Sequence, residues 1–328
     1  MARLENQLDA EVAHYRARTF AESTKKSYAS HRKSYINFCL EFGYRAVPVE
    51  HTVLCRYTAY LARRLAHSSI KKYLNIIRLM HIEMGFENPL KENWFLNSVL
   101  KGIGRVKGLS IKRKLPITPQ ILLRIKLLLN LNNPKDAVFW AACLVAFFGF
   151  FRKSNLFPPN LNNFNPQKHL CRSDFSIHPW GIMIKIKWTK TIQCGERILS
   201  TPIPLLKKHP LCPVTAVVNA FNLTRYASTE GPAFTIFEKD RFVPYSPVKF
   251  VAQLRGLLDI LGLPSKDYSG HSFRRGAASW AIQNGIPGEI IKILGDWKSD
   301  AYLAYLSLST ISKVKSIHQF SQWLPNMK

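Results

Sequence analysis

Residue types that can bind or transfer a phosphoryl group occur along the second half of the chain. They are cations, hydrogen-bond donors and tyrosines: Arg152, Lys190, His271, Arg274, Trp297, Tyr302 and Tyr305. An arginine guanidinium binds two phosphate oxygens with a rigid fork that never loses its charge. A tyrosine hydroxyl has an ordinary pKa of about 10, so it becomes nucleophilic only beside cations that stabilise the phenolate. These types together indicate chemistry on a phosphate ester.

Arg152 and Lys190 each allow two interpretations. Arg152 follows the apolar run 137–151 in "FFGFFRKSNL", where an arginine marks the solvent end of a helix or is held at the core rim for a phosphate. Lys190 lies in "KWTKTIQCGE", at the turn after an alternating segment. A lysine in a hairpin turn is either solvated or able to protonate a leaving oxygen in a minor groove.

His271 and Arg274 lie in "GHSFRRGAASWAIQNG". A spacing of three puts both on one side of a helix, and the small and apolar residues after them predict a buried helix body. A histidine and an arginine at such a place are costly unless they are paired or face a ligand, and a helix N-terminus favours an anion. Arg275 points elsewhere on this helix and is predicted to contact a DNA backbone.

The segment "KILGDWKSDAYLAYL" carries Trp297, Tyr302 and Tyr305. The tryptophan is either a core residue or an indole N–H donor to a phosphate oxygen. The two tyrosines lie on a similar helix face, so periodicity does not choose between them. At least one of them is expected to be a core residue.

The charge of the whole chain points to a polyanionic partner. The chain has 328 residues, 47 Lys+Arg against 20 Asp+Glu, and a formal net charge of +27. Nucleic acid fits this imbalance best, and no segment resembles a basic amphipathic membrane anchor. Residues 1–20 show no secretory signal, and the longest apolar run, 137–151, is shorter than a membrane span.

The cysteines predict neither disulfides nor a metal site. The six cysteines are scattered without a C-x-x-C pair, which is typical of reduced thiols in an intracellular protein. Their spacing to histidines matches no common zinc site. We therefore expect no metal site. We also expect no cofactor and no small-molecule substrate.

The first hundred residues are predicted to form helices that carry basic outer faces. Apolar residues recur at spacings of three and four in a helix from Ser23 to Gly43, in one beginning at Thr52 and in one from Ser68 to Gly85. Few acids accompany the cations on the outer faces, so these are candidate phosphate contacts: Lys25, Lys26, Arg32, Lys33, Arg63, Arg64, Lys71 and Lys72.

Residues 101–116 are predicted to be a flexible basic linker because they contain three glycines and no acid. Its predicted DNA contacts are Arg105, Lys107, Lys112, Arg113 and Lys114. Thr118 and Pro119 then predict an N-cap and first helical residue. Alternation of apolar and charged residues predicts a small antiparallel sheet within 174–201, and the chain is helical again from Ser246.

The order of these features resembles the tyrosine recombinase (phage integrase) family: Arg, a hairpin Lys, His-x-x-Arg, Trp and a C-terminal Tyr. The motifs "FRKSNL", "TKT", "HSFRRGAA" and "GDWKSDAYLAYL" are most similar to Crypton- and DIRS-type recombinases of eukaryotic mobile elements, with a Cre-like tryptophan. The resemblance implies a mainly α fold with a small antiparallel β-sheet. It also implies a helical core-binding DNA-binding domain over 1–100, the linker over 101–116 and a catalytic domain over 117–328.

The resemblance also implies a role for each site residue. Arg152 and Arg274 would clamp the scissile phosphate, and His271 would hydrogen-bond it and assist proton transfer. Lys190 would protonate the departing 5′-oxygen. These residues act without a metal or ATP, because a covalent intermediate conserves the phosphodiester energy.

The nucleophile implied by the resemblance is Tyr305. It stands eight residues after Trp297, near the family's spacing, whereas Tyr302 stands only five after it. Trp297 would hold a non-bridging oxygen and pack against the nucleophile's helix. The chain departs from many relatives at Asn155, where they have an acid, at Trp297, where they have histidine, and in a gap to the tyrosine that is one residue shorter.

The expected function is site-specific recombination for the integration or excision of a mobile element, through a 3′-phosphotyrosine and a Holliday junction. The expected partners are double-stranded DNA and further copies of the chain, as a dimer on one site and a homotetramer on two. The expected location is the nucleus in a eukaryotic host and otherwise the cytoplasm or nucleoid. Two alternatives stay open: a DNA-binding descendant without catalysis, and a type IB topoisomerase-like enzyme.

Overall fold

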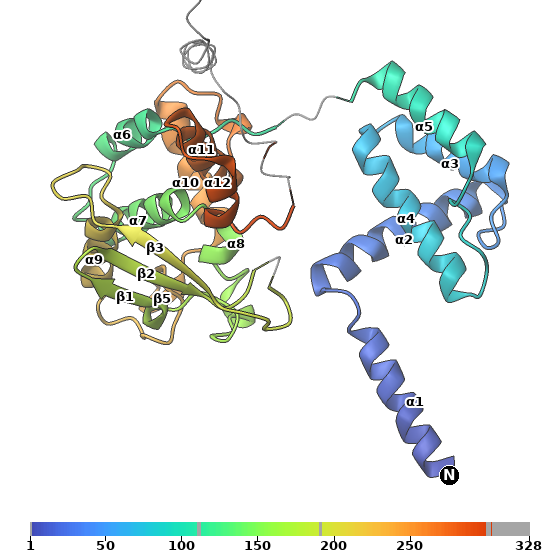
Figure 1. Cartoon of the computed structure of the whole chain (residues 1–328), viewed down its shortest axis with the longest axis horizontal. Helices are drawn as coiled ribbons and strands as arrows, with labels where there is room; N and C mark the ends of the chain where they lie inside the picture. The colour runs from blue at the N-terminus through green and yellow to red at the C-terminus, as the bar shows by residue number, and fades with distance from the viewer. Residues whose placement is uncertain (1, 110–112, 190–191, 300–302, 304–328) are drawn as a thin grey trace, which may run out of the picture. The chain divides into compact units, whose positions relative to one another are not determined.

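The computed structural model describes residues 2–109, 113–189, 192–299 and 303. It divides the chain into two units, Met1–Lys112 and Arg113–Lys328, each with its own hydrophobic core (Figure 1). Helices dominate both units, and the strands form a three-stranded and a two-stranded antiparallel sheet. The predicted fold class, mainly helical with a small antiparallel sheet, is confirmed.

The first unit consists of helices among the described residues: α1 Ala2–Ala17, α2 Glu22–Phe42, α3 His51–Ala62, α4 His67–Glu83 and α5 Trp94–Lys107. Tyr35, Tyr57 and Ile77 are fully buried in its core. Helix α2 ends at Gly43, whose φ of 69° is the left-handed conformation that glycine adopts without strain. The helix predicted to start at Ser23 begins one residue earlier, at Glu22, so Ser23 lies inside its first turn.

The predicted linker 101–116 was wrong at its start, because α5 continues through Lys107. Leu96 and Leu100 are buried, and Ile103 packs beside them at helical spacing, so core packing keeps this segment helical. Gly104 lies where a Cβ would come within 3.7 Å of the His67 ring. That distance is an ordinary van der Waals contact, so Gly104 lies within the packing of α5 against α4 and does not end the helix.

The second unit is built around the apolar helix α7. Its described residues form the helices α6 Pro119–Leu127, α7 Pro134–Phe148, α8 Lys153–Leu156, α9 Pro213–Leu223, α10 Pro247–Ile260, α11 His271–Gln283 and α12 Gly288–Leu294. They also form the 3₁₀ turns η1 Leu161–Asn163, η2 Arg172–Asp174 and η3 Ser265–Asp267. Every residue of α7 from Ala137 to Phe147 is buried. The predicted cap at Thr118 is confirmed, since its side chain accepts the Ile121 N–H.

The three-stranded sheet has the order β1 Phe175–His178, β2 Gly181–Ile186 and β3 Leu199–Pro204. Ile184 in β2 pairs with Phe175 on one side and Thr201 on the other. The isoleucines of β2 are buried and Lys185 is exposed, as the alternating pattern predicts. The antiparallel sheet expected within 174–201 is confirmed.

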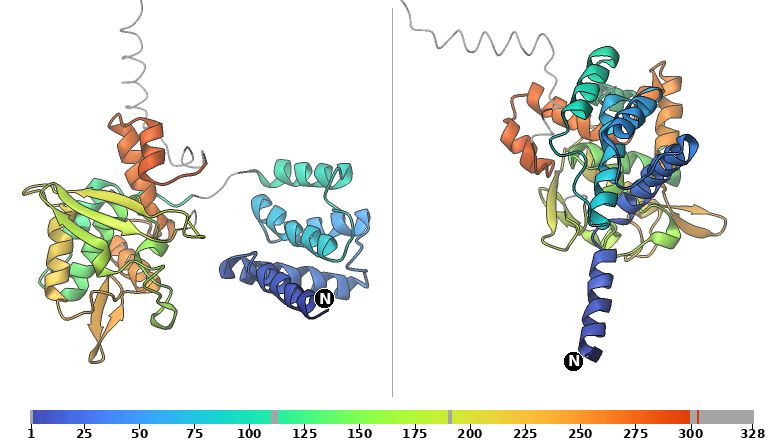
Figure 2. Two further views of the ribbon diagram at one scale, coloured as in Figure 1. Left: turned by 60° about the horizontal axis from the view of Figure 1, so that its bottom comes forward. Right: turned by 90° about the vertical axis from the view of Figure 1, so that its right-hand side faces the viewer.

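A second hairpin, β4 Thr235–Glu238 and β5 Arg241–Pro244, was not predicted. Its two turn residues, Lys239 and Asp240, have φ values of 50° and 58°. This turn type favours Asn-Gly or Asp-Gly, so Lys-Asp gives no hairpin signal. The hairpin projects from the unit in Figure 2.

In the part of the chain that the structure describes, no helix combines the length and the apolar character needed to cross a membrane.

Candidate active site

Arg274 is the side chain that joins the segments of the candidate site. It lies in the second turn of α11 and is only 3% exposed. Its guanidinium donates hydrogen bonds of 2.5 Å to the carbonyl oxygens of Phe150 and Gly295. Its Cζ stands 3.7 Å from the centroid of the Trp297 ring. One cation thereby fixes α11, the turn after α7 and the turn after α12 to one another.

Arg152 lies two residues after Phe150, whose carbonyl oxygen accepts a hydrogen bond from Arg274. Helix α7 ends at Phe148, and Phe150 has a φ of 52°, which turns the chain so that Arg152 becomes the N-cap of α8. The Arg152 N–H donates to Asn155 Oδ1 at 3.0 Å, and the Asn155 N–H donates to the Arg152 carbonyl at 2.8 Å. Asn155, where many relatives have an acid, thus holds the backbone of Arg152, whose side chain is half-buried.

His271 is exposed at the first residue of α11, one turn before Arg274. A Cβ added at the preceding Gly270 would come within 2.9 Å of Lys153 Cβ. The beginning of α11 therefore lies directly against Lys153, the neighbour of Arg152. The structure brings together the segments of Arg152, His271, Arg274 and Trp297, and their catalytic roles remain predictions.

Trp297 forms the wall beneath Arg274. Its side chain is 7% exposed, and its ring meets the Phe150 ring edge-on with centroids 6.3 Å apart. The chain reaches this position through Gly295, where a Cβ would overlap the indole, and through Asp296, whose φ is 51°. A desolvated guanidinium over an indole face is stabilised by a cation–π interaction. The tryptophan therefore positions an arginine.

Asp296 also connects the site to the chain between β2 and β3. Its carboxylate forms an ion pair with Arg197, and the exposed fractions of the two side chains are 10% and 45%. The pair links residues 99 positions apart. Sequence reasoning missed it, because a contact over this distance leaves no local pattern. The Phe150 and Gly295 carbonyls were missed for the same reason.

Three predicted catalytic or neighbouring residues lie outside the described residues. They are Lys190, Tyr302 and Tyr305. Lys112, a predicted DNA contact, also lies outside them. Their proposed roles stay predictions.

Two described tyrosines of the second unit are unsuited to act as nucleophiles. Burial raises the pKa of Tyr245, and the nearby Cys143 thiol and Asp136 carboxylate raise it further. Burial also raises the pKa of Tyr268, with Asp267 as a second cause. A raised pKa disfavours the phenolate, so neither hydroxyl is primed to attack phosphorus.

The predicted DNA contacts are spread over helices of the first unit and the start of the second. Lys25, Lys26, Arg32 and Lys33 lie on α2, Arg63 and Arg64 just after α3, Lys71 and Lys72 on α4, Arg105 and Lys107 on α5, Arg113 and Lys114 before α6, and Arg275 on α11.

Some of these cations make contacts within the protein. Arg32 pairs with Glu83 at 2.8 Å, and the Lys107 ammonium donates to the Leu65 carbonyl at 2.9 Å, beyond the end of α3. Lys107 therefore stabilises a helix end, which competes with a DNA contact.

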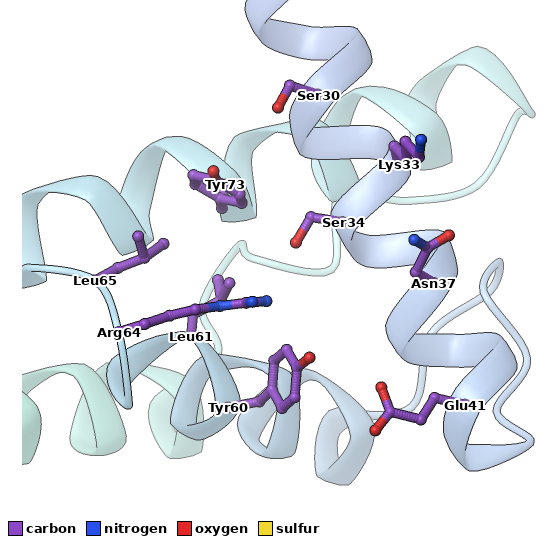
Figure 3. A pocket seen from close by; sticks show the side chains of 10 residues that line it. All are labelled: Ser30, Lys33, Ser34, Asn37, Glu41, Tyr60, Leu61, Arg64, Leu65 and Tyr73. Carbon is purple, nitrogen blue, oxygen red and sulfur yellow. The ribbon is translucent and has the colours of Figure 1, made fainter.

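Lys33 and Arg64 line a groove of 520 Å³ in the first unit, between α2, the end of α3 and α4 (Figure 3). Asn37 lines the same groove, and Arg64 Cζ lies 4.9 Å from the centroid of the Tyr60 ring. Cations beside amide and hydroxyl groups suit phosphate oxygens and base edges.

Within the described ranges, no group of three or more His, Cys, Asp or Glu side chains could hold a metal ion.

Comparisons with known proteins find a recombinase similar in sequence and integrases similar in fold. No family model matches the chain. An integrase/recombinase XerD homolog from Selenomonas ruminantium is 25% identical over 295 residues, which cover 87% of this chain and 82% of that protein.

Solved structures share the fold at lower identity. The Tn1549 transposon integrase in complex with transposon right end DNA has a TM-score of 0.57 at 12% identity, covering 95% of this chain and 98% of that one. A lambda integrase dimer bound to a core site has a TM-score of 0.57 at 13% identity, covering 92% and 95%. The chain is thus similar in sequence to an integrase/recombinase and shares the fold of the tyrosine recombinases and integrases.

Proposed function

We propose that the chain is a site-specific DNA recombinase that cuts and rejoins strands through a 3′-phosphotyrosine. The observation that carries this proposal is the anchoring of Arg274 on the Phe150 and Gly295 carbonyls, over Trp297. This anchoring holds the start of α11, with His271 and Arg274, against the segment that carries Arg152 at the N-cap of α8. Such a cluster is suited to a phosphodiester, because it offers charge and donors where negative charge develops.

The reaction requires one bond to form as another breaks. The Tyr305 oxygen attacks phosphorus and the bond from phosphorus to the 5′-oxygen breaks, so the total number of phosphate ester bonds is conserved. Arg152 and Arg274 stabilise the charge on the non-bridging oxygens, and His271 assists the proton transfer from the tyrosine. Lys190 gives its proton to the departing 5′-oxygen.

DNA binding is the part of the proposal that the whole chain supports. The XerD homolog is described as an integrase/recombinase, and the integrase structures that share the fold contain DNA. A net charge of +27 favours a phosphate backbone as partner. We infer a dimer on one site and a homotetramer on two, acting in the nucleus of a eukaryotic host and otherwise in the cytoplasm or nucleoid.

The test is a trapping assay on nicked duplexes that carry randomised central sequences. After attack near the nick, the short fragment with the free 5′-hydroxyl diffuses away, so the covalent complex accumulates and survives SDS. We expect an adduct with the wild type and with Tyr302→Phe, and none with Tyr305→Phe.

Other outcomes would identify the alternatives. DNA binding without any adduct across the library would indicate a non-catalytic DNA-binding protein. Relaxation of supercoiled DNA without partner sites would indicate a topoisomerase. An adduct that requires Tyr302 and persists in Tyr305→Phe would reverse the assignment of the nucleophile.

A further inference from the structure

The segment that leads into the second unit is bound along the helix that carries His271 and Arg274. Residues 114–117, here called the strap, lie just before α6 and belong to no helix or strand. The Leu115 N–H donates to the Asp267 carbonyl at 2.7 Å, in η3 ahead of α11. The Ile117 N–H donates to the Ser272 carbonyl at 2.9 Å. The second bond ends on α11 itself, between His271 and Arg274.

Side chains secure the same segment from both directions. Arg275 Nη1 donates to the Lys114 carbonyl at 2.5 Å, and Lys114 Nζ donates to the Lys266 carbonyl at 2.5 Å. The Ile117 side chain is fully buried in the core of the second unit. The strap is therefore a packed part of this unit, although the sequence predicts a flexible linker through residue 116.

Gly276 is the residue that allows the strap to lie so close. A Cβ at this position would stand 1.7 Å from the Ile117 carbonyl oxygen and 2.7 Å from its carbonyl carbon. Real Cβ atoms essentially never come closer than 3.0 Å, and both partners are backbone. Any side chain at 276 therefore moves the strap and α11 apart by more than an ångström. Glycine is therefore required here by the lack of space. Backbone conformation does not require it, since the φ of Gly276 is not positive.

We propose that the strap is a positioning element of the active site and that Gly276 is the residue on which this depends. Ile117 donates to Ser272 and lies against Gly276, the residues two before and two after Arg274 on α11, so displacing the strap shifts Arg274 from its two carbonyls. The inference rests on the proposed recombinase activity and deepens it, because it names the residue that positions the helix carrying His271 and Arg274.

The test compares Gly276→Ala with Gly256→Ala. Gly256 lies in α10 of the same unit, and a Cβ there meets nothing within 4 Å, so it is the matched control for adding a methyl group to a helix. We expect single-turnover adduct formation by Gly276→Ala to fall about 10²-fold, as an ångström of misplacement in a catalytic site can do. DNA affinity in the absence of cleavage should stay within twofold, which a general loss of folding would not allow.

A second pair adds no bulk to the core. Leu115→Pro removes the N–H that Asp267 accepts, while Leu115→Ala keeps it, and the Leu115 side chain is 37% exposed. Adduct formation should slow in Leu115→Pro and stay at the wild-type rate in Leu115→Ala. Hydrogen exchange at Ile117 should accelerate in Leu115→Pro and in Gly276→Ala, at unchanged helix content.

The outcomes separate the two proposals. If the wild type forms no adduct, the proposed function fails, and the strap is then judged by the Ile117 exchange alone. Wild-type adduct formation and wild-type exchange in Gly276→Ala would overturn the strap proposal while leaving the recombinase assignment intact. An equal loss in Gly256→Ala would overturn it as well.

Discussion

At the residue scale, Arg274 combines a structural role with the predicted chemistry. Its hydrogen bonds to two carbonyl oxygens and its contact with the Trp297 ring hold the guanidinium in place, and the residue is only 3% exposed. An immobile donor costs little reorganisation when the transition state forms, which is the basis of electrostatic catalysis. The same contacts mean that changing this residue affects stability and rate together.

Arg274→Lys should therefore lower both the stability of the protein and the rate of adduct formation. A lysine keeps the charge but cannot bridge two carbonyls and lie flat on an indole. We expect adduct formation to fall about 10²- to 10³-fold. The free energy of unfolding should fall by about 1–3 kcal/mol, because a buried carbonyl loses its donor. Urea unfolding and single-turnover trapping measure the two effects.

The control for this substitution is Arg225→Lys, at an exposed arginine beside Tyr226 in the same unit. Both quantities should stay near wild type there. Adduct formation by Arg274→Lys within threefold of wild type would show that Arg274 has no catalytic role.

The residue types of the site were predictable, but their contacts were not. The order of the two arginines, the histidine and the tryptophan is visible in the chain because each type has a distinct chemistry. The partners of Arg274 are main-chain carbonyls of Phe150 and Gly295, and every residue has a carbonyl. Which one is presented depends on the turns that follow α7 and α12.

At the element scale, the ion pair between Arg197 and Asp296 ties the connection between β2 and β3 to the turn after α12. That connection contains Lys190, the predicted general acid. Because Arg197 is 45% exposed, solvent screens the pair and its contribution to stability is modest. The more important consequence of the ion pair is that it positions the connection between β2 and β3.

A double-mutant cycle measures this pair. Asp296→Asn is a conservative change, because asparagine tolerates the positive φ of 51° as well as aspartate does. With Arg197→Gln as the second change, urea unfolding should give a coupling free energy of about 0.5–1 kcal/mol that decreases at high salt. A coupling of zero at low salt would show that the two side chains do not interact.

Helix ends were predictable where capping residues determine them, as at Gly43 and Thr118. The errors arose where packing overrides local preference. Helix α5 continues through Gly102 and Gly104 because its apolar face is buried, and hairpin β4–β5 turns at a Lys-Asp pair with little turn preference of its own. The packing of the strap was also not predictable, since it depends on Gly276, which lies some 160 residues later in the chain.

At the scale of the whole molecule, the charge of the chain predicts how it binds DNA. The chain has 27 more cationic than anionic side chains, and it folds into two units that each have their own core. Binding through phosphate contacts releases counterions, so affinity falls steeply as salt rises. Some predicted contacts, such as Lys107, are already engaged within the protein and should contribute less.

Lys71→Gln with Lys72→Gln should reduce this salt dependence. Both lysines are exposed on α4, and each phosphate contact contributes about 0.9 to the slope of log Kd against log salt. We expect the slope to fall in magnitude by about 1–2, as measured by fluorescence anisotropy on duplex DNA. The control is the double change of Lys207 and Lys208 to Gln, at exposed lysines outside the predicted set. Equal changes in slope for the two pairs would show that binding is not localised to α4.

The most direct measurement is to identify the residue that carries DNA in the covalent complex. Trapped adduct is digested with trypsin and a nuclease, and the nucleotide-bearing peptide is sequenced by tandem mass spectrometry. The account predicts a 3′-phosphate ester on the Tyr305 oxygen. A nucleotide on Tyr302, on a serine or on any other residue, or an attachment through a 5′-phosphate, would contradict it.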